Sequence, residues 1–246
     1  MRPTASLPPA VLHDVVALAR ARLGEGISVT DLADHAHYSP FHFTRLFTAS
    51  VGIAPGLFLG ALRLDAAKRL LLAGNDAVID VASAVGFDSL SSFSRRFRQC
   101  VGVPPASLRR VADRVADRPP RPFALADRRR DTVRIHAHVP AAAGPAACAS
   151  VWVGWYPHPA PIGLPVAGVL AAHGDPLSLP VYPDAPWLLG FALPASAGVH
   201  DLLVPTRPLV GLAHLSARTP HGLSLSFAPA PPDAVPLLSA LPSLAR

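Results

Sequence analysis

Apolar residues in the first half of the chain recur at helical spacing, and the same pattern occurs twice. Between Val78 and Pro105, apolar positions lie three and four apart, as expected for two short helices that each bury one face; these positions are Val78, Val81, Ala82, Val85, Phe93 and Phe97. The stretch from Val29 to Pro55 repeats the pattern with Val29, Leu32, Ala33, Phe43 and Phe47. Two copies of one pattern indicate two copies of one supersecondary unit.

Capping and turn residues divide each copy into two helices. In the first copy, Ser28 with Asp31 resembles a capping box, and Ser39 followed by Pro40 predicts the start of a second helix. The second copy carries its own signals in order: a cap at Asn75 or Asp76, a left-handed stop at Gly86, a cap at Ser89 and a stop at Gly102.

Helix, short turn and helix form the helix-turn-helix unit, whose second helix normally enters the DNA major groove. Burial of the paired phenylalanines leaves ten side chains to face outward from the two second helices: Phe41, His42, Thr44, Arg45, Thr48, Ser91, Ser92, Ser94, Arg95 and Arg98. Arg binds guanine, Ser serves bases or phosphates, and Phe41 suits the thymine methyl group. The alternative is that these are the solvated faces of an ordinary helical bundle; because the pattern occurs twice, we favour DNA contact.

The same region resembles the DNA-binding domain of the AraC/XylS family of bacterial transcription regulators. The resemblance rests on A-x-x-x-G-F from Ala82, S-x-F-S-R-x-F-R from Ser91 and G-x-x-P-x-x-L-R from Gly102, and it extends over residues 8–110. It implies two helix-turn-helix units joined by a long helix, with double-stranded DNA as the partner. Leu108 stands where the family more often has an aromatic residue, and Leu90 where it often has a polar one.

A long helix is predicted between the two units, from Pro55 to Leu72 with a stop at Gly74, and another helix before them, over residues 9–23. At about 1.5 Å per residue the long helix spans roughly 27 Å, so it can hold two recognition helices about one DNA turn apart. Arg63 on this helix is interpreted either as a structural pin or as a phosphate contact, and we favour the pin.

Positive charge is concentrated in the helical half. Residues 1–131 carry 18 of the 22 Lys and Arg and 12 of the 16 Asp and Glu, a net charge of +6. Residues 132–246 carry the remaining four of each sign and are neutral. The excess therefore lies where phosphate contacts require it. The N-terminus shows no signal-peptide pattern, and no apolar run approaches the ~20 residues of a membrane span, so we expect a cytoplasmic protein without a membrane partner.

Residues 113–131 mix Arg, Asp and Pro and predict a charged linker, in which Arg128, Arg129 and Arg130 could touch the DNA backbone. From Thr132 onward, short apolar runs separated by Pro, Gly and Asp predict strands, and together an all-β sandwich or small barrel over residues 132–246, of which we favour the sandwich. The runs are 132–139, 150–156, 166–172, 177–181, 186–193, 208–215 and 222–228. The segment from Leu179 to Trp187 resembles the prealbumin-like modules related to carboxypeptidase regulatory domains. The expected fold is multidomain: an all-α double helix-turn-helix domain of homeodomain-like units, residues 8–112, followed by the linker and the β-sandwich.

Catalytic and metal-binding patterns are missing from the strand-rich half. His136 and His138 share one strand face, as in His-x-His metal sites, but no Glu occurs after Glu25 to complete such a site. The motif G-x-S-x-G is absent, and Cys100 and Cys148 do not have metal-binding spacing. Cys148 also lacks the Pro and His neighbours of a methyl-acceptor cysteine. We therefore expect no metal, no cofactor and no enzymatic activity.

The sequence thus predicts a sequence-specific transcription regulator that reads two adjacent major-groove segments with two recognition helices. Two alternatives are a DNA-tethered enzyme and a β-sandwich adaptor with mostly non-specific DNA attachment. The strand-rich domain is expected to bind an effector or mediate dimerisation, so RNA polymerase, a small molecule and a second copy of the chain are further candidate partners. Residues 1–118 contain both repeats and are expected to bind DNA alone.

Overall fold

The computed structural model describes residues 6–117, 121–125, 131–140, 148–194, 198–206, 208–215 and 222–240, and the chain forms two compact units. The helical unit comprises residues 1–109 together with 231–238, and the strand-rich unit comprises residues 110–230 together with 239–246. The chain therefore returns to the helical unit near its C-terminus, which the sequence does not predict. Arg128, Arg129 and Arg130 lie outside the described residues.

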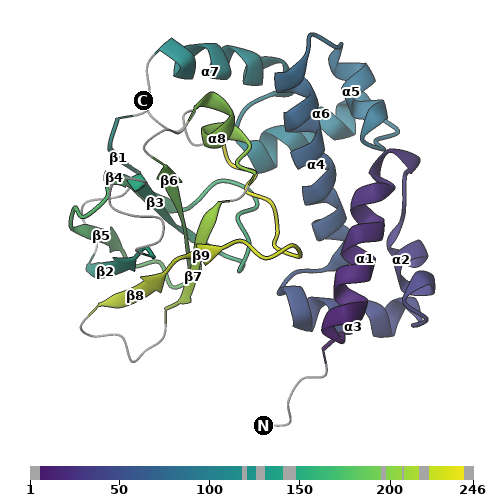
Figure 1. Cartoon of the computed structure of the whole chain (residues 1–246), viewed down its shortest axis with the longest axis horizontal. Helices are drawn as coiled ribbons and strands as arrows, with labels where there is room; N and C mark the ends of the chain where they lie inside the picture. The colour runs from purple at the N-terminus through teal and green to yellow at the C-terminus, as the bar shows by residue number, and fades with distance from the viewer. Residues whose placement is uncertain are drawn as a thin grey trace. The chain divides into compact units, whose positions relative to one another are not determined.

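Both predicted helix-turn-helix units are present in the helical unit. Its elements are α1 (Pro9–Ala21), a 3₁₀ turn (Leu23–Glu25), α2 (Val29–His35), α3 (Pro40–Val51), α4 (Pro55–Ala73), α5 (Val78–Ala84), α6 (Leu90–Val101) and the start of α7 (Pro105–Asp117). Figure 1 shows α4 running between the pair α2 and α3 and the pair α5 and α6. The four phenylalanines expected to face inward, Phe43, Phe47, Phe93 and Phe97, are fully buried.

The helix starts follow the predicted caps with one exception. Ser28 and Asp31 form a reciprocal capping box, and the hydroxyl oxygens of Ser39 and Ser89 accept backbone N–H groups three residues on. The cap of α5 was predicted at Asn75 or Asp76 and is wrong: Ala77 occupies it without a side-chain hydrogen bond. The physical reason is Arg109, whose guanidinium binds the carbonyl oxygens of Gly74 and Asp76 and fixes that segment ahead of the helix.

The two turns between paired helices have the same backbone geometry. Gly86 adopts φ +77° and His37 adopts φ +58°, and each donates its N–H three residues back, to Ser83 and Asp34 respectively. A side chain at Gly86 would meet the carbonyl oxygen of Leu23 at 2.5 Å, so glycine is required there. His37 is exposed and adopts the left-handed conformation at a modest conformational cost.

The strand-rich unit contains two sheets. All seven predicted runs contain a strand: β2 (Thr132–His138), β3 (Cys148–Tyr156), β4 (Ala167–Ala172), β5 (Leu177–Pro180), β6 (Trp187–Pro194), β7 (Leu209–His214) and β8 (Leu223–Ser226). Three short elements have too few residues to show a period and were not predicted: β1 (Phe123–Leu125), β9 (Ala228–Pro229) and α8 (Val199–Leu203). The larger sheet has the order β1-β4-β3-β6-β7-β9 and the smaller the order β5-β2-β8.

Side chains from both sheets share one apolar core. Ile135, Leu177 and Leu225 come from the smaller sheet, and Trp155 and Leu188 from the larger. Pairing is antiparallel between the described neighbours except for β2 with β8, which is parallel. On β2 the alternation is as predicted, with Ile135 inside and its polar neighbours outside, which gives the register of that strand.

The sequence also predicts a last helix over residues 106–118 that ends before Pro119 and Pro120, and α7, which ends at Asp117, confirms it. Val111 and Val115 of α7 are buried. The interval assigned to a linker, residues 113–131, additionally holds β1, which pairs with β4 and was not predicted. The valines lie four apart among charged residues, so a single buried stripe is enough to extend the helix. Within the described part of the chain, no single helix is long and apolar enough to cross a membrane; α3 and α4 pass that test only together and are bent by 63°.

Candidate nucleic-acid interface

Helices α3 and α6 are equivalent, residue by residue. Each has twelve residues, begins after a capping serine and ends at a left-handed glycine, Gly52 at φ +84° and Gly102 at φ +96°. Aligned in this way, Phe41 corresponds to Ser91 and Arg45 to Arg95. The sequence therefore builds the same open helix twice, with different side chains on it.

The ten side chains predicted to face outward are all at least partly accessible. Five are exposed, namely Phe41, Arg45, Ser91, Arg95 and Arg98, and five are half-buried, namely His42, Thr44, Thr48, Ser92 and Ser94. Phe41 is 84% exposed, an unusual position for so large an apolar side chain. These residues can thus reach a ligand that lies along the helices.

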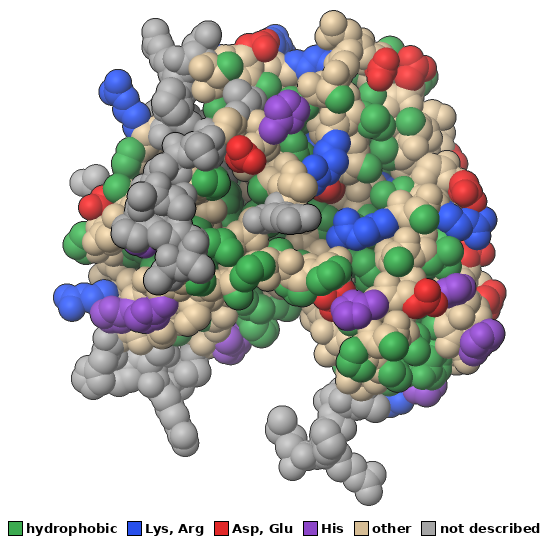
Figure 2. Space-filling model, viewed as in Figure 1, with side chains coloured by type: hydrophobic (Ala, Val, Ile, Leu, Met, Phe, Trp, Pro, Cys, Tyr) green, Lys and Arg blue, Asp and Glu red, His purple; other side chains and the backbone are tan. Residues whose placement is uncertain are grey.

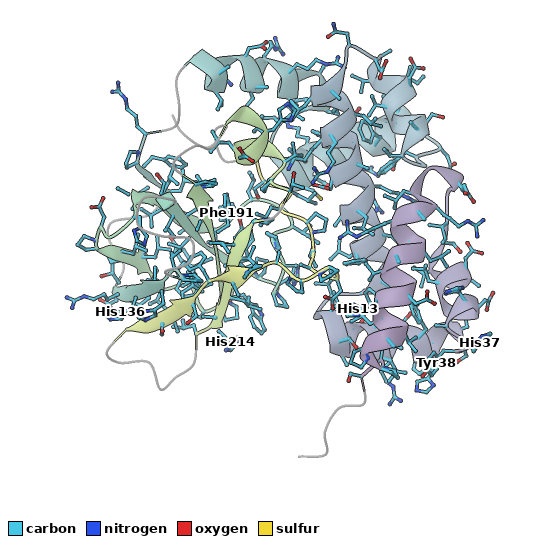
Figure 3. The ribbon with its side chains drawn as sticks, viewed as in Figure 1. His13, His37, Tyr38, His136, Phe191 and His214 are labelled. Carbon is cyan, nitrogen blue, oxygen red and sulfur yellow. The ribbon has the colours of Figure 1, made fainter. Side chains whose placement is uncertain are left out.

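Local contacts orient two of these side chains. The His42 ring packs edge-on against Tyr38 with ring centroids 5.2 Å apart, and Tyr38 lies at the turn before α3 (Figure 3). The hydroxyl oxygens of Ser89 and Ser91 are 2.8 Å apart, so one donates to the other. Ser91 therefore keeps part of its hydrogen-bonding capacity for a ligand and uses part within the cap.

Arg63 has a structural contact within the helical unit. Its Nη2 donates to the carbonyl oxygen of Ile27 at 2.8 Å, and burial lowers the pKa of its guanidinium, which still stays charged. Its Nε is buried without a hydrogen-bond partner among the described residues. This geometry favours the pin over the phosphate contact, because the side chain joins α4 to the segment before α2.

Metal-binding geometry is not found in the described ranges. No three His, Cys, Asp or Glu side chains lie close enough together there to hold an ion. His136 lies on β2 and His214 on β7, in different sheets and well separated in Figure 3. The indole of Trp187 packs edge-on against His214, with ring centroids 4.6 Å apart.

Comparison with known proteins identifies the helical region. A family model described as a helix-turn-helix domain matches residues 32–111. The transcriptional activator AarP of Providencia stuartii is 32% identical over 103 residues, which cover 42% of this chain and 76% of AarP. The chain belongs to the AraC/XylS family of helix-turn-helix transcription regulators.

Other AraC/XylS relatives match the same region only. The regulator Rv1931c of Mycobacterium tuberculosis is 37% identical over 92 residues, and YobQ of Bacillus subtilis, an uncharacterized transcriptional regulator, is 35% identical over 94 residues. The chain spans 36% and 39% of the lengths of these two relatives. A solved structure, the DNA-binding domain of AdpA in complex with a target DNA, is 37% identical and covers 44% of this chain and 96% of AdpA's domain, with a TM-score of 0.40.

One exposed cation on the second recognition helix was missed by sequence reasoning. Arg96 is exposed and occupies the position of Leu46, which is buried in α3. A side chain added at Gly60 of α4 would lie 3.6 Å from the Arg96 guanidinium, so this arginine lies along α4. The signal was available, because aligning the two helices places a charged residue opposite a core position.

Charge of both signs surrounds these helices. Within α6 there are three arginines, Arg95, Arg96 and Arg98, and no carboxylate. On the face drawn in Figure 2, Lys and Arg side chains alternate with Asp and Glu over the helical elements, so this face is not an uninterrupted basic surface. Within its own residues, Leu90–Val101, α6 therefore carries charge of one sign only.

Proposed function

We propose that this chain is a sequence-specific DNA-binding transcription regulator that reads two adjacent major-groove segments with α3 and α6. One observation carries the proposal: two equivalent capped helices, each with an open outer face, are joined through the single buried helix α4. The relatives named above as transcriptional regulators support it.

The length of α4 suits this reading. Its 19 residues span about 28 Å at ~1.5 Å per residue, and the major groove of B-DNA returns to one face every ~34 Å. Ten of its residues are buried, so α4 has little freedom to bend. A rigid spacer of nearly one DNA turn allows both recognition helices to enter the groove from one side.

The two recognition helices are proposed to read different bases. On α6, Arg95 is placed to bind guanine O6 and N7, and Ser92 and Ser94 to reach bases or phosphates. On α3, Arg45 plays the same part, and Phe41 is proposed to contact a thymine methyl group. We also propose Arg96 as a phosphate contact.

The strand-rich unit is proposed to be a β-sandwich that binds an effector or mediates dimerisation. Its two sheets share one core, as sandwiches do. Trp187 and Tyr182 are only half-buried, and aromatic side chains of this kind commonly line ligand pockets or subunit contacts. The similarity to prealbumin-like modules stays a prediction, as do RNA polymerase, a small-molecule effector and a second copy of the chain as partners.

Selection of bound sequences from a random DNA pool with the full chain tests the proposal. Enrichment of one motif with two conserved blocks about ten base pairs apart is expected. Salt-sensitive binding without any enriched motif would contradict it and would favour the adaptor with non-specific attachment. Chemical change of the DNA by the purified protein would favour the tethered enzyme.

A further inference from the structure

Residues 231–238, here called the strap, belong to the helical unit although the chain reaches them after the strand-rich unit. Figure 1 shows this yellow segment following β9. The carbonyl oxygen of Pro232 accepts a hydrogen bond from Arg20 of α1 at 3.1 Å, and that of Leu237 accepts one from Lys68 of α4 at 2.8 Å. Leu238 is fully buried. The strap therefore touches two helices of the DNA-binding unit.

Lys68 makes the strap more than a surface covering. It is the only lysine of the chain, and its side chain is fully buried in α4. A buried ammonium group is costly unless a partner satisfies it. The Leu237 carbonyl oxygen is its hydrogen-bond acceptor, while the Asp65 carboxylate favours its charge and the Arg69 guanidinium opposes it. Without the strap, this ammonium would lose its acceptor inside α4.

A second anchor lies one helical turn further along α4. Arg109 is the last residue of the helical unit before the chain enters the strand-rich unit. Its Nε donates to the carbonyl oxygens of Leu71 and Gly74, and its Nη2 to that of Asp76. The carbonyls of Leu71 and Gly74 are at the end of α4, where the last helical turn leaves acceptors free, and that of Asp76 lies in the segment between α4 and α5. The chain thus leaves and re-enters the helical unit through anchors at Leu71 and Lys68.

We propose that the strap and Arg109 form a clasp by which the strand-rich unit controls the second helix-turn-helix unit. The last turns of α4 lead directly into α5, so loosening them frees α5 and α6 relative to α3. A change in the strand-rich unit that withdraws the strap then weakens DNA contact by α6 more than contact by α3. The weakening of DNA contact by α6 rests on the proposed DNA-binding function. The attachment of the strap and Arg109 to the last turns of α4 does not rest on it.

Four full-length proteins test the clasp: the natural chain, Lys68→Met, a chain whose strap is replaced by an equally long Gly/Ser sequence, and both changes together. Met fills the space of Lys without its charge. Amide hydrogen exchange is measured across α4 and α5. A Gly/Ser strap keeps its backbone carbonyls but lacks the buried side chain of Leu238, so it is expected to leave α4 and take the Lys68 acceptor with it. Exchange over residues 70–84 should then speed at least about tenfold, as for loss of a hydrogen bond to a charged group, while α2 and α3 change little. Adding Lys68→Met is expected to restore part of the protection.

Three results would overturn the clasp: unchanged exchange over residues 70–84, equal acceleration in α2 and α3, or strictly additive effects of the two changes. If the strap-replaced chain does not fold, the single substitution Lys68→Met tests the clasp. It removes the hydrogen bond to the Leu237 carbonyl, so the amides of the strap are expected to exchange faster. Unchanged exchange of these amides would contradict the clasp. Arg22→Met is the control, because it removes an exposed charge whose partner is Glu25.

Footprinting on a DNA site selected with the natural chain tests whether the strap controls DNA contact by α6. Strap replacement is expected to lose protection at the block contacted by α6 before the block contacted by α3. Equal loss at both blocks would contradict the control of α6. If no site can be selected, the proposed DNA-reading function fails, whereas the exchange arm still decides whether the clasp exists.

Discussion

The guanidinium of Arg63 donates a hydrogen bond to the carbonyl oxygen of Ile27 at 2.8 Å, across 36 residues of sequence. The bond joins α4 to the chain just before α2. In the sequence, an arginine that joins two elements cannot be told from one that binds a phosphate, because each is a single arginine on a helix. They differ in what their removal changes, and this difference can be measured.

Arg63→Met is expected to lower the free energy of unfolding by about 1.5–3 kcal/mol, because a buried carbonyl oxygen loses a charged donor. The slope of DNA affinity against salt concentration should not change. A phosphate contact would instead reduce that slope by about 0.9 and leave stability nearly unaltered. Urea unfolding and DNA titration at several salt concentrations separate the two, with Arg22→Met as the exposed control.

Arg45→Ala and Arg95→Ala are each expected to cost about 1–3 kcal/mol on the selected DNA site and to relax preference at one base pair. The two affected base pairs should lie about one helical turn apart, because α4 holds the helices apart by nearly that length. Both arginines are exposed, so folding stability should not change. Uniform weakening on every sequence would show phosphate contacts instead.

Phe41 is expected to recognise a thymine methyl group, because an apolar ring 84% exposed on a recognition helix has no core to fill. Replacing thymines of the selected site by deoxyuridine, which lacks the methyl group, should weaken binding by the natural chain at one position. Phe41→Ala should bind both DNAs alike and unfold like the natural chain. Equal sensitivity of the two proteins to the methyl group would remove Phe41 from the base contacts.

The helix-turn-helix elements could be predicted because their signals are local. Ser39, Ser89 and Gly86 act on backbone within a few residues, and the buried phenylalanines repeat with the helical period. The strap could not be predicted, because Lys68 and Leu237 are 169 residues apart and Leu237 belongs to no periodic pattern that would link it to α4. The prediction of the α5 cap was wrong for the same reason, because a side chain distant in sequence, Arg109, fixes the segment before α5.

The pH dependence of stability should reveal the buried ammonium. Burial lowers the pKa of Lys68 from 10.5 to about 8. Below pH 8, Lys68 is protonated in both the folded and unfolded chains; between about 8 and 10.5 the unfolded chain binds more protons, so stability rises with pH. Lys68→Met should lack this rise, which amounts to roughly 1.4 kcal/mol for each pKa unit of lowering.

The measurement is the difference in unfolding free energy between the natural chain and Lys68→Met from pH 7 to 10. Burial also raises the pKa of Cys100 and Tyr156, which lowers stability at high pH, but both residues are present in both proteins and cancel. A difference that does not vary with pH would mean that Lys68 titrates normally.

The isolated fragment 1–118, which lacks the strap, tests whether the strap completes the helical unit. The sequence predicts that this fragment binds DNA, since it holds both repeats, but it lacks residues 231–238. Lys68 in the fragment has lost the Leu237 carbonyl, so Lys68→Met should stabilise the fragment. In the full chain the same substitution leaves that carbonyl without its donor, so the gain should be smaller or reversed. Chemical unfolding of the four proteins gives the coupling free energy between Lys68 and the strap. A coupling of zero would mean that the fragment finds another acceptor for the ammonium and that the strap does not complete the helical unit.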